Sequence, residues 1–433
     1  MTIPAGAGGY FSVRVPARLL LFLLLPLSSP AQEVIPESSG DALEVYLVTI
    51  GPGDEVWNKF GHNALRIVDT RRGTDLSYNY GIFDFAQPGF LTRFVLGEMW
   101  YSVASFPTGA MLEAYRRQNR DIWLQELRLA AGEKAALRGY LEWNVLPENQ
   151  SYSYDYFLDN CSTRVRDALD IALDGSLRRT FEDLPAGTTY RSVSRRLTGD
   201  ELLYSTGVHA GLGPFTDRPL SAWDEMFIPM ELRGHLNTLA EETRRRGGEP
   251  LVARDTLLFD ATRPPPPERP PRRLAGFLLA GLSLGVGMAV LGWFAPASTP
   301  ARVGFTVLGG GWGGVAGAVG VLLLFLWLFT DHQAAHRNEN LLHLNPLSLP
   351  LLPLLPLAAA GQGWAGRLAV LCAAGAAGLS LLGLLVGWLP GLPQVNGEIL
   401  ALALPLNFGA LAGAVFLQRK PLWTSRNRKR WIK

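Results

Sequence analysis

Charged residues are almost missing from one long part of this chain. Only six Asp, Glu, Lys or Arg residues occur between Leu274 and Leu417, whereas about a quarter of the residues in an ordinary globular domain are charged. The remaining residues carry a normal share of charge. A protein that is soluble throughout is therefore excluded, and the uncharged stretch predicts a membrane domain.

Cysteine is also scarce, and the chain has little net charge. The two cysteines, Cys161 and Cys372, lie in different halves of the chain, so no internal disulfide framework is expected. The net charge is +2, and basic residues are mixed with acidic ones except at the C-terminus, which disfavours nucleic acid as a partner.

The first 31 residues have the pattern of a secretory signal peptide. Arg14 and Arg18 precede an apolar run from Leu19 to Leu27, and small residues follow near Ala31, as at a cleavage site. An uncleaved anchor is the alternative. In both cases, the segment that follows is expected to be exported.

We expect an exported α+β domain over residues 32–262, a proline-rich linker over 263–273, a transmembrane domain over 274–417 and a basic cytoplasmic tail over 418–433. Within the exported domain, apolar alternation and helical periodicity predict strands at 42–50, 63–68, 77–85, 121–129 and 152–157, and helices at 54–60, 133–145 and 161–173. The expected membrane spans are Leu274–Phe294, Gly304–Thr330, Leu347–Ala360, Leu368–Trp388 and Ile399–Leu417. Five spans and the positive-inside rule place the C-terminus in the cytoplasm of an inner-membrane protein, with Arg302 and Arg367 in inside loops.

Cys161 is the first candidate for chemistry. It follows Asn160, a good N-cap, so it should lie in the first turn of a helix, where the helix dipole favours the nucleophilic thiolate. The competing interpretation is that Cys161 is a small, buried apolar residue. A thiol that stays unpaired in an oxidising compartment favours a function.

His62 is the candidate base for that thiol. Histidine is the side chain that accepts a proton near neutral pH, and His62 begins a predicted strand. If the strands at 63–68 and 77–85 form a hairpin centred near Gly73, Asp84 lies opposite His62 and would orient its ring, with Asn79 as the second choice. Hydrogen bonding at a turn or strand edge is an equally good interpretation of both residues.

A polar segment interrupts the membrane domain. It contains His332, His336 and His343 together with Asn338 and Asn340. The histidine spacing, without cysteine, disfavours a metal site, so we expect no metal and no cofactor. Contact with a lipid headgroup or an acceptor substrate at the outer surface is the preferred interpretation of His332, Asn338 and Asn340.

Three motifs, in this order, resemble the Lnb-type bacterial lipoprotein N-acyltransferases. They are Lys59-Phe60-Gly61-His62, the segment Tyr78–Phe85, and the segment Asp159–Asp167 around Cys161. The layout of signal, soluble domain and five membrane helices is similar as well. The resemblance implies a permuted papain-like domain of the lecithin:retinol acyltransferase and NlpC-like kind, with histidine before cysteine.

The activity that this resemblance implies is acyl transfer. Cys161 would attack a membrane phospholipid ester while His62 takes its proton, and the thioester would pass the acyl chain to the amine of a diacylglyceryl lipoprotein. Asn160, Ser162 and the N–H groups at the helix start could stabilise the oxyanion. Two alternatives stay open: a cysteine peptidase or amidase that acts on the cell wall, and a non-catalytic, membrane-anchored binding module.

Overall fold

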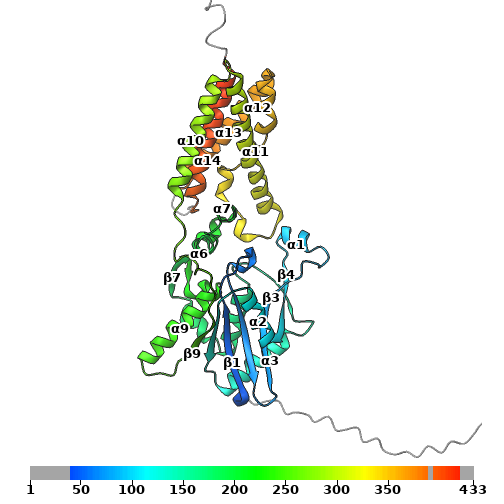
Figure 1. The fold of residues 1–433 in the computed structure, drawn as a ribbon, viewed down its shortest axis with the longest axis vertical. Helices are drawn as coiled ribbons and strands as arrows, with labels where there is room; N and C mark the ends of the chain where they lie inside the picture. The colour runs from blue at the N-terminus through cyan, green and yellow to red at the C-terminus, as the bar shows by residue number, and fades with distance from the viewer. Residues whose placement is uncertain (1–39, 389–393, 420–433) are drawn as a thin grey trace, which may run out of the picture. The chain divides into compact units, whose positions relative to one another are not determined.

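The computed structural model describes residues 40–388 and 394–419. The predicted signal peptide and nearly all of the basic tail lie outside these residues. The first part of the described chain is rich in sheet and the second is helical, so the expected α+β class with a following helical bundle is confirmed (Figure 1).

A seven-stranded antiparallel sheet forms the centre of the N-terminal domain, in the order β6-β4-β3-β2-β1-β5-β9. Its strands are β1 (Leu43–Ile50), β2 (His62–Asp69), β3 (Thr74–Ile82), β4 (Trp100–Pro107), β5 (Ile122–Leu127), β6 (Ser151–Ser153) and β9 (Val252–Phe259). The sequence pattern predicts β1, β2, β3, β5 and β6 to within a few residues, but not β4 and β9.

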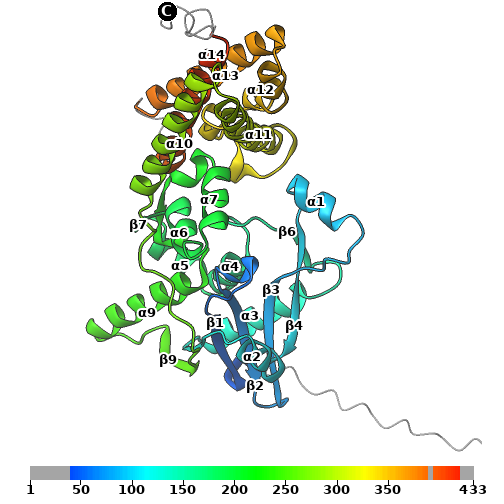
Figure 2. The ribbon, with the colours of Figure 1, turned by 45° about the horizontal axis from the view of Figure 1, so that its top comes forward.

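Helices cover both faces of the sheet because its central strands carry apolar side chains on both faces. On one face, Val45 and Leu47 pack against α3 (Ala131–Asn144), α4 (Cys161–Ala172) and α9 (Pro229–Arg245). On the other, Val48 and Ile50 pack against Met111 of α2 (Thr108–Arg117). Figure 2 shows α1 (Phe90–Leu96) projecting on the side of β4 and β6.

The rest of the N-terminal domain is a helical segment with a small two-stranded sheet. Its elements are α5 (Ser176–Phe181), β7 (Pro185–Thr189), α6 (Tyr190–Leu197), α7 (Leu202–Gly211), β8 (Pro219–Ser221) and α8 (Ala222–Glu225). Tyr190 and Phe227 pack together in its own core.

The linker over residues 263–273 contains no helix or strand, as its prolines require. Both of its ends contact the N-terminal domain. Arg263 donates to Pro52 O at 2.8 Å and to Asp54 at 2.6 Å, while the Arg273 side chain donates to Gly199 O. These contacts fix the linker against the domain at each end.

Four helices are long and apolar enough to span a membrane: α10 (Leu274–Phe294), α11 (Thr299–Phe329), α13 (Gly363–Val386) and α14 (Gly397–Leu417). A bent pair, Glu339–Ser348 and α12 (Leu351–Ala359), brings the number to five if it counts as one span. The glycines of α11 allow close helix packing, since a Cβ on Gly313 would come within 2.6 Å of Leu351 Cβ.

Contacts between helix ends favour the bent pair as a fifth crossing of the bundle. Trp293 of α10 packs on Phe416 of α14, and Gln418 donates to Gly366 O in α13. The start of α11, which follows α10 closely, therefore lies at the same end as the start of α13. Because α11 has 31 residues, a return of the chain across the bundle before α13 begins agrees with these contacts.

Candidate active site

Cys161 occupies the first position of α4, and Asn160 caps the helix as expected. The Asn160 Oδ1 atom accepts hydrogen bonds from the N–H groups of Ser162 at 2.8 Å and Thr163 at 3.0 Å. Its Nδ2 atom donates to Tyr156 O and Phe227 O. The cap satisfies N–H groups that the helix cannot satisfy itself and fixes the position of the thiol.

Two opposing effects act on the pKa of Cys161. Burial raises the pKa of the thiol, while the backbone N–H groups of Asn63 and Ser162 donate to the sulfur and lower it, as does the positive charge of Arg120. Burial is the larger effect. The resting thiol is therefore protonated at neutral pH and needs a base.

His62 begins β2 and lies next to Asn63, whose N–H group reaches the Cys161 sulfur. The His62 Nε2 atom lies 3.0 Å from Asn79 Oδ1, and Asn79 Nδ2 donates to Ser77 O at 3.0 Å. That second bond fixes the amide orientation, so Oδ1 can only accept and Nε2 must carry the proton. The basic lone pair of His62 is then on Nδ1.

Burial keeps this imidazole neutral, because it lowers the pKa of His62 to about 4. The ring also packs against Tyr115 of α2, with 5.9 Å between ring centroids. A half-buried, neutral imidazole with a fixed tautomer can act as a general base.

Asp84 does not lie opposite His62, so the expected hairpin register is wrong. Ala64 pairs with Asn79, and the same register extended by two residues places Gly81 beside His62. The turn ends at Gly73, which has φ of +65°, instead of being centred on it. Asp84 is exposed, and its Oδ1 atom accepts from Ala86 N.

Gly81, which the sequence analysis did not single out, lies against the thiol. It has φ of +86° where the β3–β4 register shifts between Asn79 and Ile82, so glycine fits this irregular strand position. A Cβ on Gly81 would lie 3.5 Å from Cys161 Cβ and 4.0 Å from the Tyr154 ring. A glycine inside an otherwise regular strand pattern was the available signal.

Arg120 is a second residue that sequence reasoning missed. It is 2% exposed, donates to Gly51 O at 2.9 Å and Asn58 Oδ1 at 3.0 Å, and lies over the Tyr115 ring at 5.0 Å. Among the described residues, its Nη2 atom has no hydrogen-bond partner. An arginine among many others in the sequence gave no signal of this position.

The Asn160 and Ser162 side chains, predicted to bind substrate, are engaged within the protein. Ser162 is fully buried, and its Oγ lies 2.6 Å from Met226 O and 2.8 Å from Asn63 Oδ1. Because the Ser162 and Thr163 N–H groups donate to the Asn160 cap, the N–H group of Cys161 itself is the remaining candidate from this segment for stabilising an oxyanion.

The polar segment of the membrane domain contacts the N-terminal domain. Asn338 and Asn340 are buried, and both donate to Ala210 O near the end of α7. His332 is half-buried; its Nε2 atom lies 3.0 Å from Phe94 O, and its ring stacks on Tyr156, with 6.2 Å between ring centroids. Of His332, Asn338 and Asn340, His332 is thus the residue that contacts the segment just before Cys161.

The described residues contain no group of three or more His, Cys, Asp or Glu side chains that could hold a metal ion. Instead, Asn79 holds the His62 ring, which packs on Tyr115, while Gly81 and the Asn63 N–H group lie against Cys161. A thiol, a neutral base and an orienting amide suit covalent acyl chemistry.

Comparison with known families gives two matches. Residues 32–196 match the Lnb N-terminal periplasmic domain, and residues 312–410 match the Lnb transmembrane domain. Together they cover more than half of the chain. Neither a curated protein nor a solved structure matches the sequence. The chain therefore belongs to the Lnb family: it is a lipoprotein N-acyltransferase-like membrane protein that crosses the membrane several times and carries an N-terminal periplasmic domain.

Proposed function

We propose that this protein moves an acyl chain from a membrane phospholipid to the N-terminal amine of a diacylglyceryl lipoprotein through a thioester on Cys161. The observation that carries the proposal is the tautomer of His62: Asn79 holds its Nε2 proton, so Nδ1 keeps its lone pair, and the N–H group of the next residue, Asn63, bonds the Cys161 sulfur.

In the first step, His62 Nδ1 takes the proton of Cys161 as the sulfur attacks the ester carbonyl. The C–O bond to the glycerol then breaks, the leaving alkoxide takes the proton from His62, and a lysophospholipid departs. The Cys161 N–H group, at the start of α4, stabilises the oxyanion. The Cys161 acyl thioester and a neutral His62 remain.

In the second step, the lipoprotein amine attacks the thioester. His62 accepts a proton from the amine and returns it to the Cys161 sulfur as the C–S bond breaks. The products are an N-acylated lipoprotein and the free thiol. A membrane domain joined to the catalytic domain suits two substrates that stay in the bilayer.

Mass spectrometry of a lipoprotein N-terminal peptide tests the proposal, in cells with the wild-type gene, without it, and with Cys161→Ala or His62→Ala as the sole copy. We expect an added N-acyl group in the wild type alone, with each variant protein still present in the membrane. An N-acyl group that persists with Cys161→Ala would reject the mechanism.

The same spectra test the donor. Transfer from a phospholipid leaves both ester-linked chains on the lipoprotein glycerol, so the peptide gains one acyl mass. A peptide that gains the N-acyl group but loses one ester-linked chain would show that the donor is the lipoprotein itself and would overturn the phospholipid assignment. Cleaved wall peptides with unchanged lipoproteins would favour the peptidase alternative.

A further inference from the structure

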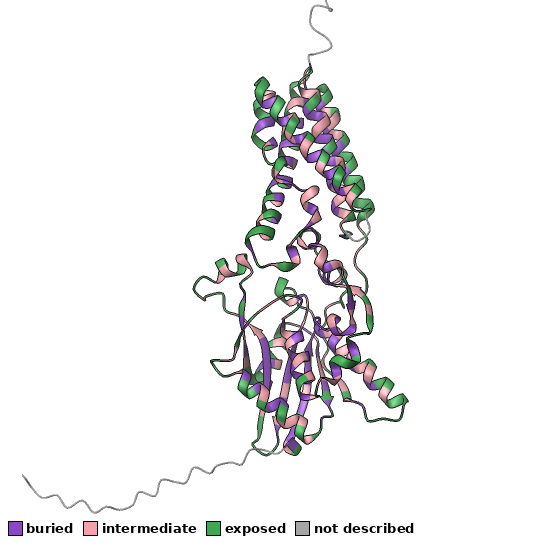
Figure 3. Ribbon diagram, turned by 180° about the vertical axis from the view of Figure 1, so that it is seen from behind, coloured by how far each residue is buried: buried purple, intermediate pink, exposed green. Residues whose placement is uncertain are grey.

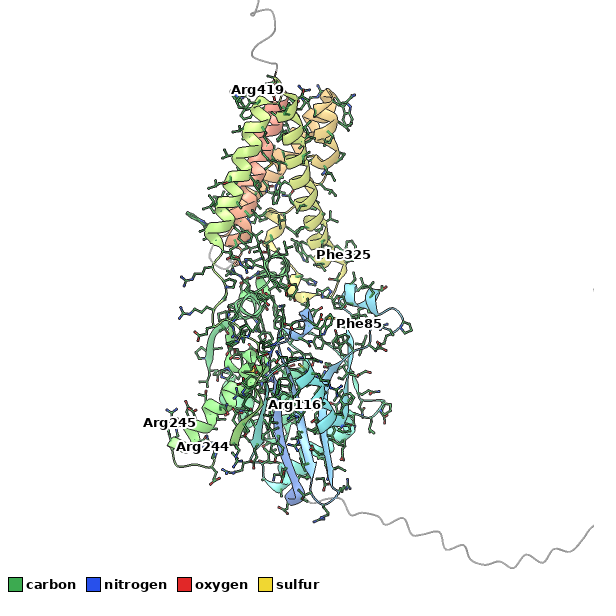
Figure 4. All side chains as sticks on the ribbon, viewed as in Figure 1. Phe85, Arg116, Arg244, Arg245, Phe325 and Arg419 are labelled. Atoms are coloured by element: carbon green, nitrogen blue, oxygen red, sulfur yellow. The ribbon has the colours of Figure 1, made fainter. Side chains whose placement is uncertain are left out.

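The α1 segment exposes apolar side chains on the N-terminal domain. The exposed fractions are 63% for Phe85, 72% for Leu91, 39% for Phe94 and 43% for Val95, and α1 has no buried residue (Figure 3). Phe85, labelled in Figure 4, lies in the loop that leads into α1. A cluster of exposed apolar side chains of this kind marks an interaction surface.

Arg93, the charged residue of α1, does not point its guanidinium group into this apolar surface. The Arg93 guanidinium turns back to donate to Pro88 O at 2.7 Å and to Gln87 Oε1 at 3.1 Å. The exposed surface of this segment is therefore formed mainly by the four apolar side chains.

Hydrogen bonds join α1 to the end of the α11 membrane span. Asp331 N donates to Leu96 O at 2.7 Å, and the His332 ring contacts Phe94 O at 3.0 Å. The span itself ends at Phe329, and Leu328 and Phe329 are 58% and 66% exposed. The exposed apolar side chains of α1 thus lie next to the end of α11, whose last residues are also exposed and apolar.

A series of ring contacts leads inward from α1. Successive centroids lie 6.1 Å apart from Phe94 to Phe90, 6.1 Å from Phe90 to Phe83, 5.0 Å from Phe83 to Tyr101 and 4.3 Å from Tyr101 to Tyr154. Tyr154 borders Gly81, which lies against Cys161. These rings connect the membrane-level surface with the thiol.

We propose that α1 inserts its apolar side chains among lipid acyl chains of the outer leaflet, and that the aromatic series from Phe94 to Tyr154 binds the acyl chain on its way to Cys161. Insertion of α1 rests on exposure and on the contacts with α11 alone. The acyl-chain role of the rings rests on the proposed function as well, so the two parts need separate tests.

Photo-crosslinking tests the insertion. The full-length protein with Leu91→p-benzoylphenylalanine is placed in nanodiscs of phosphatidylethanolamine and phosphatidylglycerol and irradiated. Ile171, which is 57% exposed near the end of α4, receives the same substitution as the matched control. We expect lipid adducts at position 91 in at least tenfold excess over position 171, and equal yields would overturn the insertion.

The crosslinking is carried out in a Cys161→Ser background, so it does not depend on catalysis. Adducts at position 91 with no acyl transfer by the wild-type protein would reject the proposed function and leave the insertion standing. Acyl transfer by the wild-type protein without adducts at position 91 would reject the insertion and leave the proposed function standing.

Chain-length dependence tests the aromatic series. Phe90→Ala is compared with wild type in acylation of Cys161 by dioleoyl and by dihexanoyl phosphatidylethanolamine. We expect the KM for the long-chain donor to rise about tenfold while the short-chain donor is affected much less. An equal loss for both donors would reject the series as an acyl-chain site.

Leu91→Asp repeats the comparison at an exposed position, without disturbing the core. An unchanged KM for the long-chain donor in this variant would contradict a role of the α1 surface in binding the acyl chain.

Discussion

The resting state of the Cys161–His62 pair follows from burial, which outweighs the backbone hydrogen bonds and the Arg120 charge that act on the thiol. A helix N-terminus stabilises an anion by about 0.3–1 kcal/mol. Full burial can shift a pKa by as much as 3–5 units, at about 1.4 kcal/mol per unit. Burial therefore prevails: it raises the pKa of Cys161 and lowers that of His62 to about 4. Both groups are neutral at pH 7, so in the proposed mechanism the proton moves during the attack.

The neutral pair makes a prediction about alkylation. Because the pKa of Cys161 is raised above its usual value near 9, the thiolate fraction grows as pH rises. We expect the iodoacetamide rate at Cys161, followed by mass spectrometry of its peptide, to keep rising between pH 6 and pH 9.5. A rate that stays constant from pH 5 to pH 8 would indicate a preformed thiolate–imidazolium pair and contradict this.

Arg120 lowers the pKa of Cys161 by its charge, although less than burial raises it. Replacement by Met removes this charge, so the alkylation profile of Arg120→Met should move to higher pH. Arg120→Lys keeps a charge and serves as the control, with a smaller displacement. Identical profiles for wild type and Arg120→Met would show that the guanidinium does not act on the thiol.

Asn79 and Asp84 give opposite expectations. Asn79→Ala frees the His62 ring to rotate and change tautomer, so it should remove part of the roughly 10²- to 10⁴-fold benefit of general-base catalysis. Asp84→Ala removes only a turn contact with Ala86 N and should keep near-wild-type transfer. Rates of lipoprotein N-acylation by the purified variants decide, and a larger loss with Asp84→Ala would restore the original expectation.

At the scale of elements, local signals were sufficient for some features and insufficient for others. The Asn160 cap and the apolar face of α4, including Val165 and Leu169, follow from short-range chemistry and could be predicted. The choice of Asn79 over Asp84 could not, because it depends on where the 70–73 turn ends. A shift of two or three residues in that register changes the partner of His62 completely.

The strands β4 and β9 could not be predicted, because their sequences lack a regular pattern. β4 ends in the exposed residues Phe106 and Pro107, and β9 pairs with β5 across irregular register positions. Neither shows the strict alternation that marks a half-buried strand. The contribution of Arg120 likewise depends on contacts between distant segments, at Gly51 and Asn58.

Backbone contact between α10 and α14 makes a prediction about membrane-domain stability. A Cβ on Gly285 would come within 2.4 Å of Pro405 O, whereas a Cβ on Gly287 meets nothing within 4 Å. Gly285→Leu should therefore force the helices apart and cost roughly 1–3 kcal/mol or more, and Gly287→Leu should not. Thermal unfolding in detergent measures this; equal Tm values for the two variants would contradict the close packing.

At the scale of the whole molecule, the number of crossings determines where the chain ends. The N-terminal domain is periplasmic, and the end of α14 meets the start of α13 through Gln418 and Gly366. If the bent segment Glu339–Ala359 crosses the membrane, the protein has five crossings. The C-terminus and the Gly361 loop are then cytoplasmic, on the same side as Arg302, Arg367 and Arg419, which agrees with the positive-inside rule.

Reporter fusions distinguish five crossings from four. With five, alkaline phosphatase fused after Leu417 or after Gly361 should be inactive, and green fluorescent protein at the same positions should fluoresce. If the bent segment instead re-enters and leaves on the same side, both Leu417 and Gly361 face the periplasm. Alkaline phosphatase is then active at both positions, and green fluorescent protein does not fluoresce. A fusion after Ala297, between α10 and α11, is cytoplasmic in both topologies and controls for expression. An active phosphatase after Leu417 would contradict the five-crossing topology, because only an even number of spans can return the chain to the side of its N-terminal domain.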